Sequence, residues 1–255
     1  MCAQRASHVR WNGNYAFGSD TLLARPKLAA QIAATISGWA ITEAHLGRAL
    51  AILVGSTQPA ALAMYMAVRS FDAQRDMLMA AVSEVMRPRY ARLIKVCLDV
   101  IGKGYKDRNQ FAHWIWGASS DPNLDALLLV EPKHFWNLAA EQTKFLKAQG
   151  ISPASIGSSG FPVLINQPML DHAHIQIYRG GDLEEAHQRM DQNFRIAEGV
   201  RLLAGANGAQ RRLLYHLLCT EPAIQQALQN MKKNNLPKRR RAAQKSPGKG
   251  PKKGA

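Results

Sequence analysis

The chain is poor in acidic residues and in cysteines, and it has no long apolar run. Its 255 residues include 18 Asp or Glu against 33 Lys or Arg, so the formal charge is +15. Cys2, Cys97 and Cys219 are odd in number, far apart in sequence and without a Cys-x-x-Cys pair. We therefore expect neither a disulfide framework nor a zinc knuckle, but reduced thiols in a cytoplasmic protein.

Signals for export and membrane insertion are also missing. Residues 1–18 lack the apolar segment of a secretory signal. The most apolar stretch, residues 28–41, is interrupted by Gln31, Thr35 and Ser37 and falls short of membrane-spanning length. We expect no membrane partner.

The positive charge is concentrated at the C-terminus. Residues 232–255 hold ten Lys or Arg and no acid, which leaves 23 basic against 18 acidic residues, or +5, for the rest. We expect this tail to be disordered, because its low-complexity sequence has nothing to bury. Lys238, Arg239, Arg240 and Arg241 are its densest cations and are candidate RNA-binding residues. A merely solvated extension remains the alternative.

The periodicity of apolar residues predicts a mainly α-helical protein. We expect an irregular arm over 1–24, a helical domain over 25–231 and the basic tail over 232–255. Within the domain, 27–120 would form a core bundle of three long helices, which begin at Pro26, Pro59 and Pro88. The third helix would continue to Ile115, with Gly102 and Gly104 weakening or kinking it.

A small β element and further helices should follow, over 121–231. The apolar run 126–130 and the alternating segment 173–178 predict two strands, and 117–123 reads as a turn. Asp182 and Glu185 stand three apart, as in a capping box that begins a helix. Other segments read as helices at 135–147, 209–218 and 223–231, and as a loop at 150–160.

The most informative motif is Arg108-Asn109-Gln110-Phe111-Ala112-His113. Arginine can hold a phosphate bidentately, and an imidazole can transfer protons near neutral pH. At about 100° per residue, Asn109 and His113 share a helix face, whereas Arg108 lies about 140° from His113 and on the apolar stripe.

A structural role for the same residues stays open. Arg108 could be paired with Glu43 or Asp72 inside the bundle, since a cation on a core stripe is normally paired. Glu43 could instead help to position Arg108 for a ligand, or belong to an ordinary solvated face. His113 could be a core histidine beside Trp114 and Trp116.

The Arg, polar residue, three residues, His pattern, preceded by long helices, resembles the signature of the HEPN superfamily, in its bacterial or phage form. The resemblance covers roughly residues 27–120 and continues more weakly beyond them. It implies a helical bundle that dimerises so that Arg and His of both chains share one cleft. His113 would then transfer protons, Arg108 would neutralise the scissile phosphate and Asn109 would orient both. Many such proteins are metal-independent ribonucleases with toxin or defence roles, and some do not cleave RNA.

The sequence therefore favours a metal-independent RNA endonuclease that acts as a homodimer, possesses no cofactor and meets an antitoxin or regulatory partner. Non-catalytic RNA binding or partner binding by the same bundle is the main alternative, and an antitoxin-like interaction protein is a third. Asp171, His172 and His174 offer a weaker metal site, for which no further ligands are evident.

Overall fold

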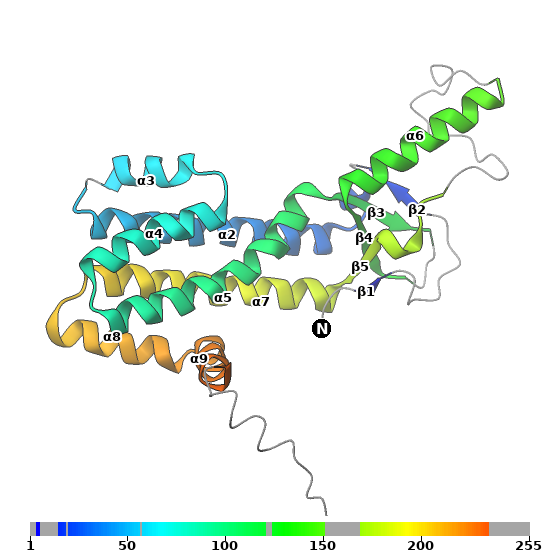
Figure 1. Cartoon of the computed structure of the whole chain (residues 1–255). Helices are drawn as coiled ribbons and strands as arrows, with labels where there is room; N and C mark the ends of the chain where they lie inside the picture. Colours follow the sequence, from blue (N-terminus) through cyan, green and yellow to red (C-terminus); the bar gives the residue numbers. More distant parts are fainter. Residues whose placement is uncertain are drawn as a thin grey trace, which may run out of the picture. The chain divides into compact units, whose positions relative to one another are not determined.

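The protein is mainly helical in a computed structural model that describes residues 4–5, 15–18, 20–56, 58–120, 124–150 and 169–234 (Figure 1). The chain forms two compact units, each made of two separate stretches of sequence. The first contains Met1–Gly47 and Ile101–Glu198, and the second contains Arg48–Val100 and Gly199–Ala255. The helices are α1 (Asp20–Leu23), α2 (Pro26–Leu53), α3 (Gln58–Ala67), α4 (Phe71–Val85), α5 (Pro88–His113), α6 (Pro132–Ala148), α7 (Gly180–Gly205), α8 (Gly208–Thr220) and α9 (Pro222–Asn234).

Among the described residues, no helix combines the length and the apolar character that crossing a membrane requires.

The first unit is organised around an antiparallel sheet in the order β1-β5-β4-β3-β2. Its strands are β1 (Gln4–Arg5), β2 (Tyr15–Phe17), β3 (Ile115–Ser119), β4 (Ala126–Val130) and β5 (Ile175–Arg179). The predicted strand at 126–130 is confirmed, and it is the central one. The strand expected at 173–178 begins two residues later, because residues 172–174 form a 3₁₀ turn.

Both faces of β4 are covered, which explains why all five of its residues are buried. Leu128 and its neighbours on one face pack with β5 and with Phe135 and Leu138 of α6. Leu127 and Leu129 face the other way and pack with Phe111 of α5 and with residues of α2 and α7. Fully buried strands lose the polar–apolar alternation of a half-exposed strand, and the run Ala-Leu-Leu-Leu-Val has that character.

The second unit is helical throughout its described part. It contains the end of α2, α3, α4, the first part of α5, the end of α7, α8 and α9. Leu78, Ile94, Cys97 and Leu98 are fully buried in it. Helices α7 and α8 approach closely at Gly199, where a Cβ would lie 2.6 Å from Leu218 Cδ2.

The prediction of one long helix between Pro59 and the helix that begins at Pro88 is wrong, because this stretch forms two helices, α3 and α4. The break falls at residues 68–70, where the Ser70 hydroxyl accepts a hydrogen bond from Ala73 N at 3.1 Å and caps α4. The Gln74 amide donates to Val68 O at 3.0 Å and so satisfies a carbonyl left free at the break.

The predicted turn at 117–123 is also wrong in its first half. Helix α5 ends at His113, and residues Ile115–Ser119 form β3 between β2 and β4. Gly117 is not a turn residue there: a Cβ would lie 2.6 Å from Phe17 Cε1, so the glycine allows β2 to approach. Residues 121–123 lie outside the described residues, as does most of the expected loop at 150–160.

Two smaller expectations need correction. The arm at 1–24 is not simply irregular, since it supplies β1, β2 and α1. Gly102 and Gly104 lie within α5, which continues through both to His113. Helix α7 begins at Gly180 rather than at Asp182. The Asp182 carboxylate, in the first turn, accepts a hydrogen bond from Arg179 N at 2.9 Å, so it caps the helix by reaching back to the residue before it.

Candidate functional site

The candidate motif occupies the last two turns of α5, and the sheet anchors these turns. The Trp116 indole donates to Phe111 O at 3.1 Å and satisfies a carbonyl at the helix end. The Phe111 ring packs edge-on against Tyr178 of β5, with 5.2 Å between ring centroids. The backbone that carries Arg108, Asn109 and His113 is therefore held by buried aromatic contacts.

Arg108 is half-buried and is held by its neighbour rather than by an acid. Its Nη1 donates to Asn109 Oδ1 at 3.0 Å, while its Nε is shielded from solvent without a hydrogen-bond partner in the described part of the chain. The structural pairing considered with Glu43 is not formed, and Asp72 pairs instead with Arg75 of its own helix at 3.2 Å. The guanidinium thus keeps donors for an anion.

The side chain of Asn109 contacts that of Arg108. Its carboxamide oxygen accepts the hydrogen bond from Arg108 Nη1. Asn109 and His113 are four residues apart in one helix and so lie on the same face. A hydrogen bond between these two side chains is not among the contacts of the described residues.

His113 is the last residue of α5, and its side chain is exposed. The reading of His113 as a core histidine is therefore wrong. In an α-helix, a separation of five residues corresponds to about 140° around the axis and about 7.5 Å along it. Arg108 and His113 of one chain consequently face different directions.

An ion pair beside the motif joins α5 to α7. Arg189 donates from Nε and Nη2 to Asp107 Oδ2, at 3.0 and 2.9 Å, and its Nη1 lies 3.6 Å from Glu185. Arg189 also lines a polar depression of about 370 Å³ on α7, together with Glu185, Gln188, Gln192 and Arg195. Sequence reasoning missed this pair, because the two residues are 82 positions apart and no local pattern links them.

The other predicted site residues are Glu43 and the four cations of the C-terminal tail. Glu43 is half-buried on α2, where no ion pair joins it to Arg108. Lys238, Arg239, Arg240 and Arg241 lie outside the described residues.

Two histidines form a stacked pair that the sequence did not reveal. The rings of His134 on α6 and His174 are 3.7 Å apart between centroids and nearly parallel, at 11°. Burial, together with the nearby His174 and Lys133, lowers the pKa of His134, and Glu131 opposes that shift. The two rings border a cavity of about 230 Å³ that Asp171 and Glu141 also line.

The predicted metal site at Asp171, His172 and His174 finds no support. The 3₁₀ turn at 172–174 removes the shared strand face on which that prediction depended. In the described ranges, no group of three or more His, Cys, Asp or Glu side chains could hold a metal ion.

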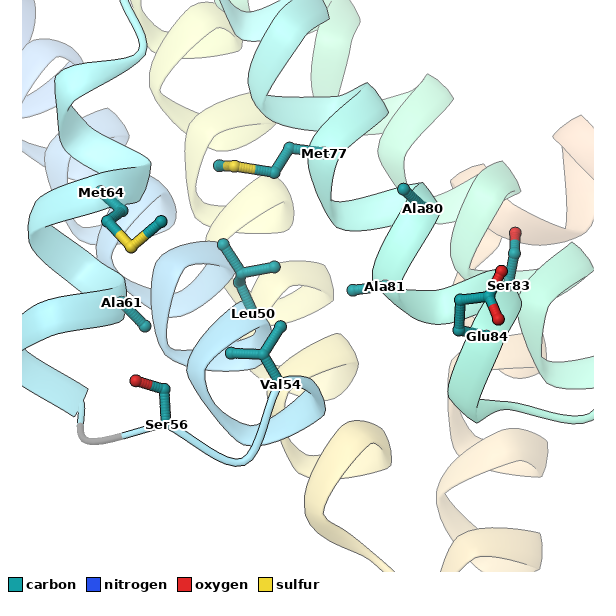
Figure 2. A pocket seen from close by; sticks show the side chains of 10 residues that line it. All are labelled: Leu50, Val54, Ser56, Ala61, Met64, Met77, Ala80, Ala81, Ser83 and Glu84. Atoms are coloured by element: carbon teal, nitrogen blue, oxygen red, sulfur yellow. The ribbon is translucent and has the colours of Figure 1, made fainter.

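A separate apolar pocket of about 480 Å³ lies in the second unit, between the end of α2, α3 and α4. Figure 2 shows Leu50, Val54, Met64 and Met77 extending into the same space from these helices. Its lining carries the Glu84 carboxylate and two serine hydroxyls but no cation or imidazole. This pocket therefore lacks the groups for phosphodiester chemistry.

No protein-family model, curated protein or solved structure matches this chain.

Proposed function

We propose that the protein is a metal-independent RNA endonuclease with a HEPN-like bundle, of the toxin or defence type. The observation that carries the proposal is the state of Arg108: a half-buried guanidinium oriented by Asn109 and paired with no carboxylate of the described residues. A half-buried guanidinium without a carboxylate partner keeps donors for an anion, so a phosphate is a suitable partner. A reducing, cytoplasmic location belongs to the same proposal, because Cys97 and Cys219 are free thiols.

The chemistry needs no group beyond these side chains and RNA itself. One His113 removes the proton of a 2′-hydroxyl, and that oxygen attacks the adjacent phosphorus. Arg108 neutralises the charge that builds on the phosphate oxygens. The bond from phosphorus to the 5′-oxygen breaks, and a protonated imidazole supplies that oxygen with a proton. The products are a 2′,3′-cyclic phosphate and a 5′-hydroxyl.

A homodimer is part of the proposal. Because Arg108 and His113 face different directions around α5, one chain presents them poorly to a single phosphate. Two copies that juxtapose the ends of their α5 helices would bring an Arg108 and two exposed His113 side chains to one cleft. An antitoxin or another regulatory partner would then act by covering that cleft.

The test is cleavage of RNA in the presence of EDTA. We expect the wild type to cut RNA and not DNA, because DNA lacks the 2′-hydroxyl. His113→Ala should slow cleavage by about 10²–10⁴-fold, the usual contribution of a general acid–base group. Arg108→Ala should slow cleavage as well, because the charge that builds on the phosphate is no longer neutralised. His172→Ala, which removes another exposed imidazole, is the matched control and should cut normally.

Two results would contradict this function. The first is cleavage that stops in EDTA and returns with magnesium, because the proposed groups need no metal. The second is normal cleavage by His113→Ala at matched thermal stability. In that case Arg108 and Asn109 would be parts of a non-catalytic RNA-binding or partner-binding module.

A further inference from the structure

Five arginines of the second unit lie at the start of α5 and on α8. None of them forms an ion pair with a carboxylate of the described chain, and all but Arg211 are exposed. Arg75 and Lys95 of the same unit do have acidic partners, Asp72 and Asp76 for Arg75 and Asp99 for Lys95. We call this set the arginine cluster; it consists of Arg87, Arg89, Arg92, Arg211 and Arg212.

Aromatic rings hold part of the cluster in place. The Arg89 guanidinium carbon lies 4.4 Å from the centre of the Tyr90 ring and 5.9 Å from that of Tyr215. The Arg211 guanidinium carbon lies 5.9 Å from the Tyr90 ring, on the other helix. The two tyrosines meet edge-on, at 5.6 Å between centroids, so they join α5 to α8. Cations from both helices are therefore parts of one surface.

The charges of this surface reach Tyr215 as well. Burial and the nearby Cys219 raise the pKa of Tyr215, whereas the positive charges of Arg89 and Arg92 lower it. Both arginines are thus close enough to influence a half-buried phenol. His216 lies next to this ring, edge-on at 5.7 Å, and its side chain is exposed.

An arginine that forms no ion pair with a carboxylate is stabilised when an anion binds to it. Arginine offers a planar fork of donors that matches phosphate, and an exposed ring such as that of His216 offers a surface on which a base can stack. Phosphates at regular intervals together with bases are the features of a single-stranded nucleic acid. An acidic protein would supply the charge but would leave the rings unused.

We propose that the arginine cluster binds the phosphate backbone of single-stranded RNA. The choice of RNA over single-stranded DNA rests on the proposed ribonuclease activity; the choice of a nucleic acid does not. The cluster differs from Arg108, Asn109 and His113, which belong to the first unit. It holds the substrate and takes no part in bond breaking.

The test measures RNA affinity as a function of salt in the full chain with His113→Ala, so that no RNA is cut. Each phosphate contact on a single strand contributes about 0.7 to the slope of log affinity against log salt. Replacing Arg89, Arg92 and Arg211 with Gln should therefore lower that slope by about 2. The charge-matched control replaces Lys27, Lys144 and Lys147, exposed lysines of the first unit, with Gln and should leave the slope near its original value.

The outcomes separate the cluster from the catalytic proposal. An unchanged slope in the arginine variant overturns the RNA site, and so does an equal decrease in the lysine control, which would show a net-charge effect. Unchanged RNA affinity with lost binding of polyglutamate would indicate an acidic protein partner and also overturn it. Because the assay reads binding alone, failure of RNA cleavage does not affect it.

A second variant is needed because Arg89 packs on Tyr90, so replacing Arg89 could unfold the protein. Replacing only Arg92 and Arg212 with Gln removes two exposed cations that are outside the ring contacts described above. This variant should fold normally and lower the slope by about 1.4. If it folds and the slope does not change, the RNA site is wrong.

Discussion

Replacing Gly104 with Ala would test how α5 is held against α7, one turn before Arg108. A Cβ at this position would overlap Asn193 Nδ2, and it would lie 3.3 Å from Asn193 Cγ and 3.8 Å from Met190 Cε. Asn193 is only 3% exposed, so its amide has no solvent to move into. The same amide donates to Ile101 O at 3.5 Å, and a displaced side chain would lose this contact.

The expected loss of stability follows from three effects. Overpacking a buried contact costs about 1–3 kcal/mol, and a lost buried hydrogen bond costs about 1 kcal/mol more. The higher helix propensity of alanine returns about 1 kcal/mol. Gly104→Ala should therefore lower the free energy of unfolding by about 1–3 kcal/mol, measured by urea denaturation.

Gly181→Ala is the control for this substitution. A Cβ at Gly181, in the first turn of α7, meets nothing within 4 Å. This variant should be more stable than the wild type by about 0.5 kcal/mol, because alanine restricts the unfolded chain. A Gly104→Ala protein as stable as the Gly181→Ala protein would refute the proposed close packing of α5 on α7.

Two further predictions concern ionisable groups. The pKa of His134 is lowered from 6.5, so its share of the stability is complete above pH 6.5 and is lost as the pH falls through the lowered value. His134→Gln should therefore make the unfolding free energy fall less steeply below about pH 6.5, as measured by urea denaturation at a series of pH values; a variant with the wild-type pH dependence would contradict this. Burial, with Cys219 nearby, raises the pKa of the Cys97 thiol. An alkylating reagent should therefore modify Cys97 only after the protein unfolds. Peptide mass spectrometry that finds Cys97 of the native protein labelled as fast as Cys219 would contradict this.

Helix beginnings were the most predictable part of the fold. Pro26 and Pro88 were predicted to begin helices, and both do. Proline at the first helical position loses no hydrogen bond, so this signal is local and does not depend on the rest of the fold. The helix break at Ser70 was equally local, since a serine precedes an acidic first turn there, but the continuing apolar stripe concealed it.

The sheet was only partly predictable, because its contacts are long-range. The buried strand Ala126–Val130 can be predicted from its unbroken apolar run. Strands β2 and β3 have no such run, and Gly117 reads as a turn until Phe17, one hundred residues earlier in the chain, lies against it. A glycine that permits a close approach and a glycine that permits a turn look the same in sequence.

The candidate sites also differ in how far local sequence predicts them. Helical spacing alone predicted that Arg108 would lie on the inner side of α5, and its side chain is half-buried. Its hydrogen-bond partner could not be predicted: the guanidinium is bound by Asn109 rather than by Glu43. The arginine cluster was not predictable at all. Arg89 and Arg211 are far apart in sequence, and each stretch alone resembles an ordinary solvated helix face.

The direction in which Arg108 and His113 point makes the oligomeric state decisive for the proposed chemistry. If light scattering shows a dimer at micromolar concentration, two α5 ends can supply one phosphate with a guanidinium and with both an acid and a base. If the protein is an active monomer, the shared cleft is wrong, because one chain offers only one imidazole at the end of α5. Arg108 would then serve as a phosphate anchor, and a side chain outside the motif would have to carry at least one proton.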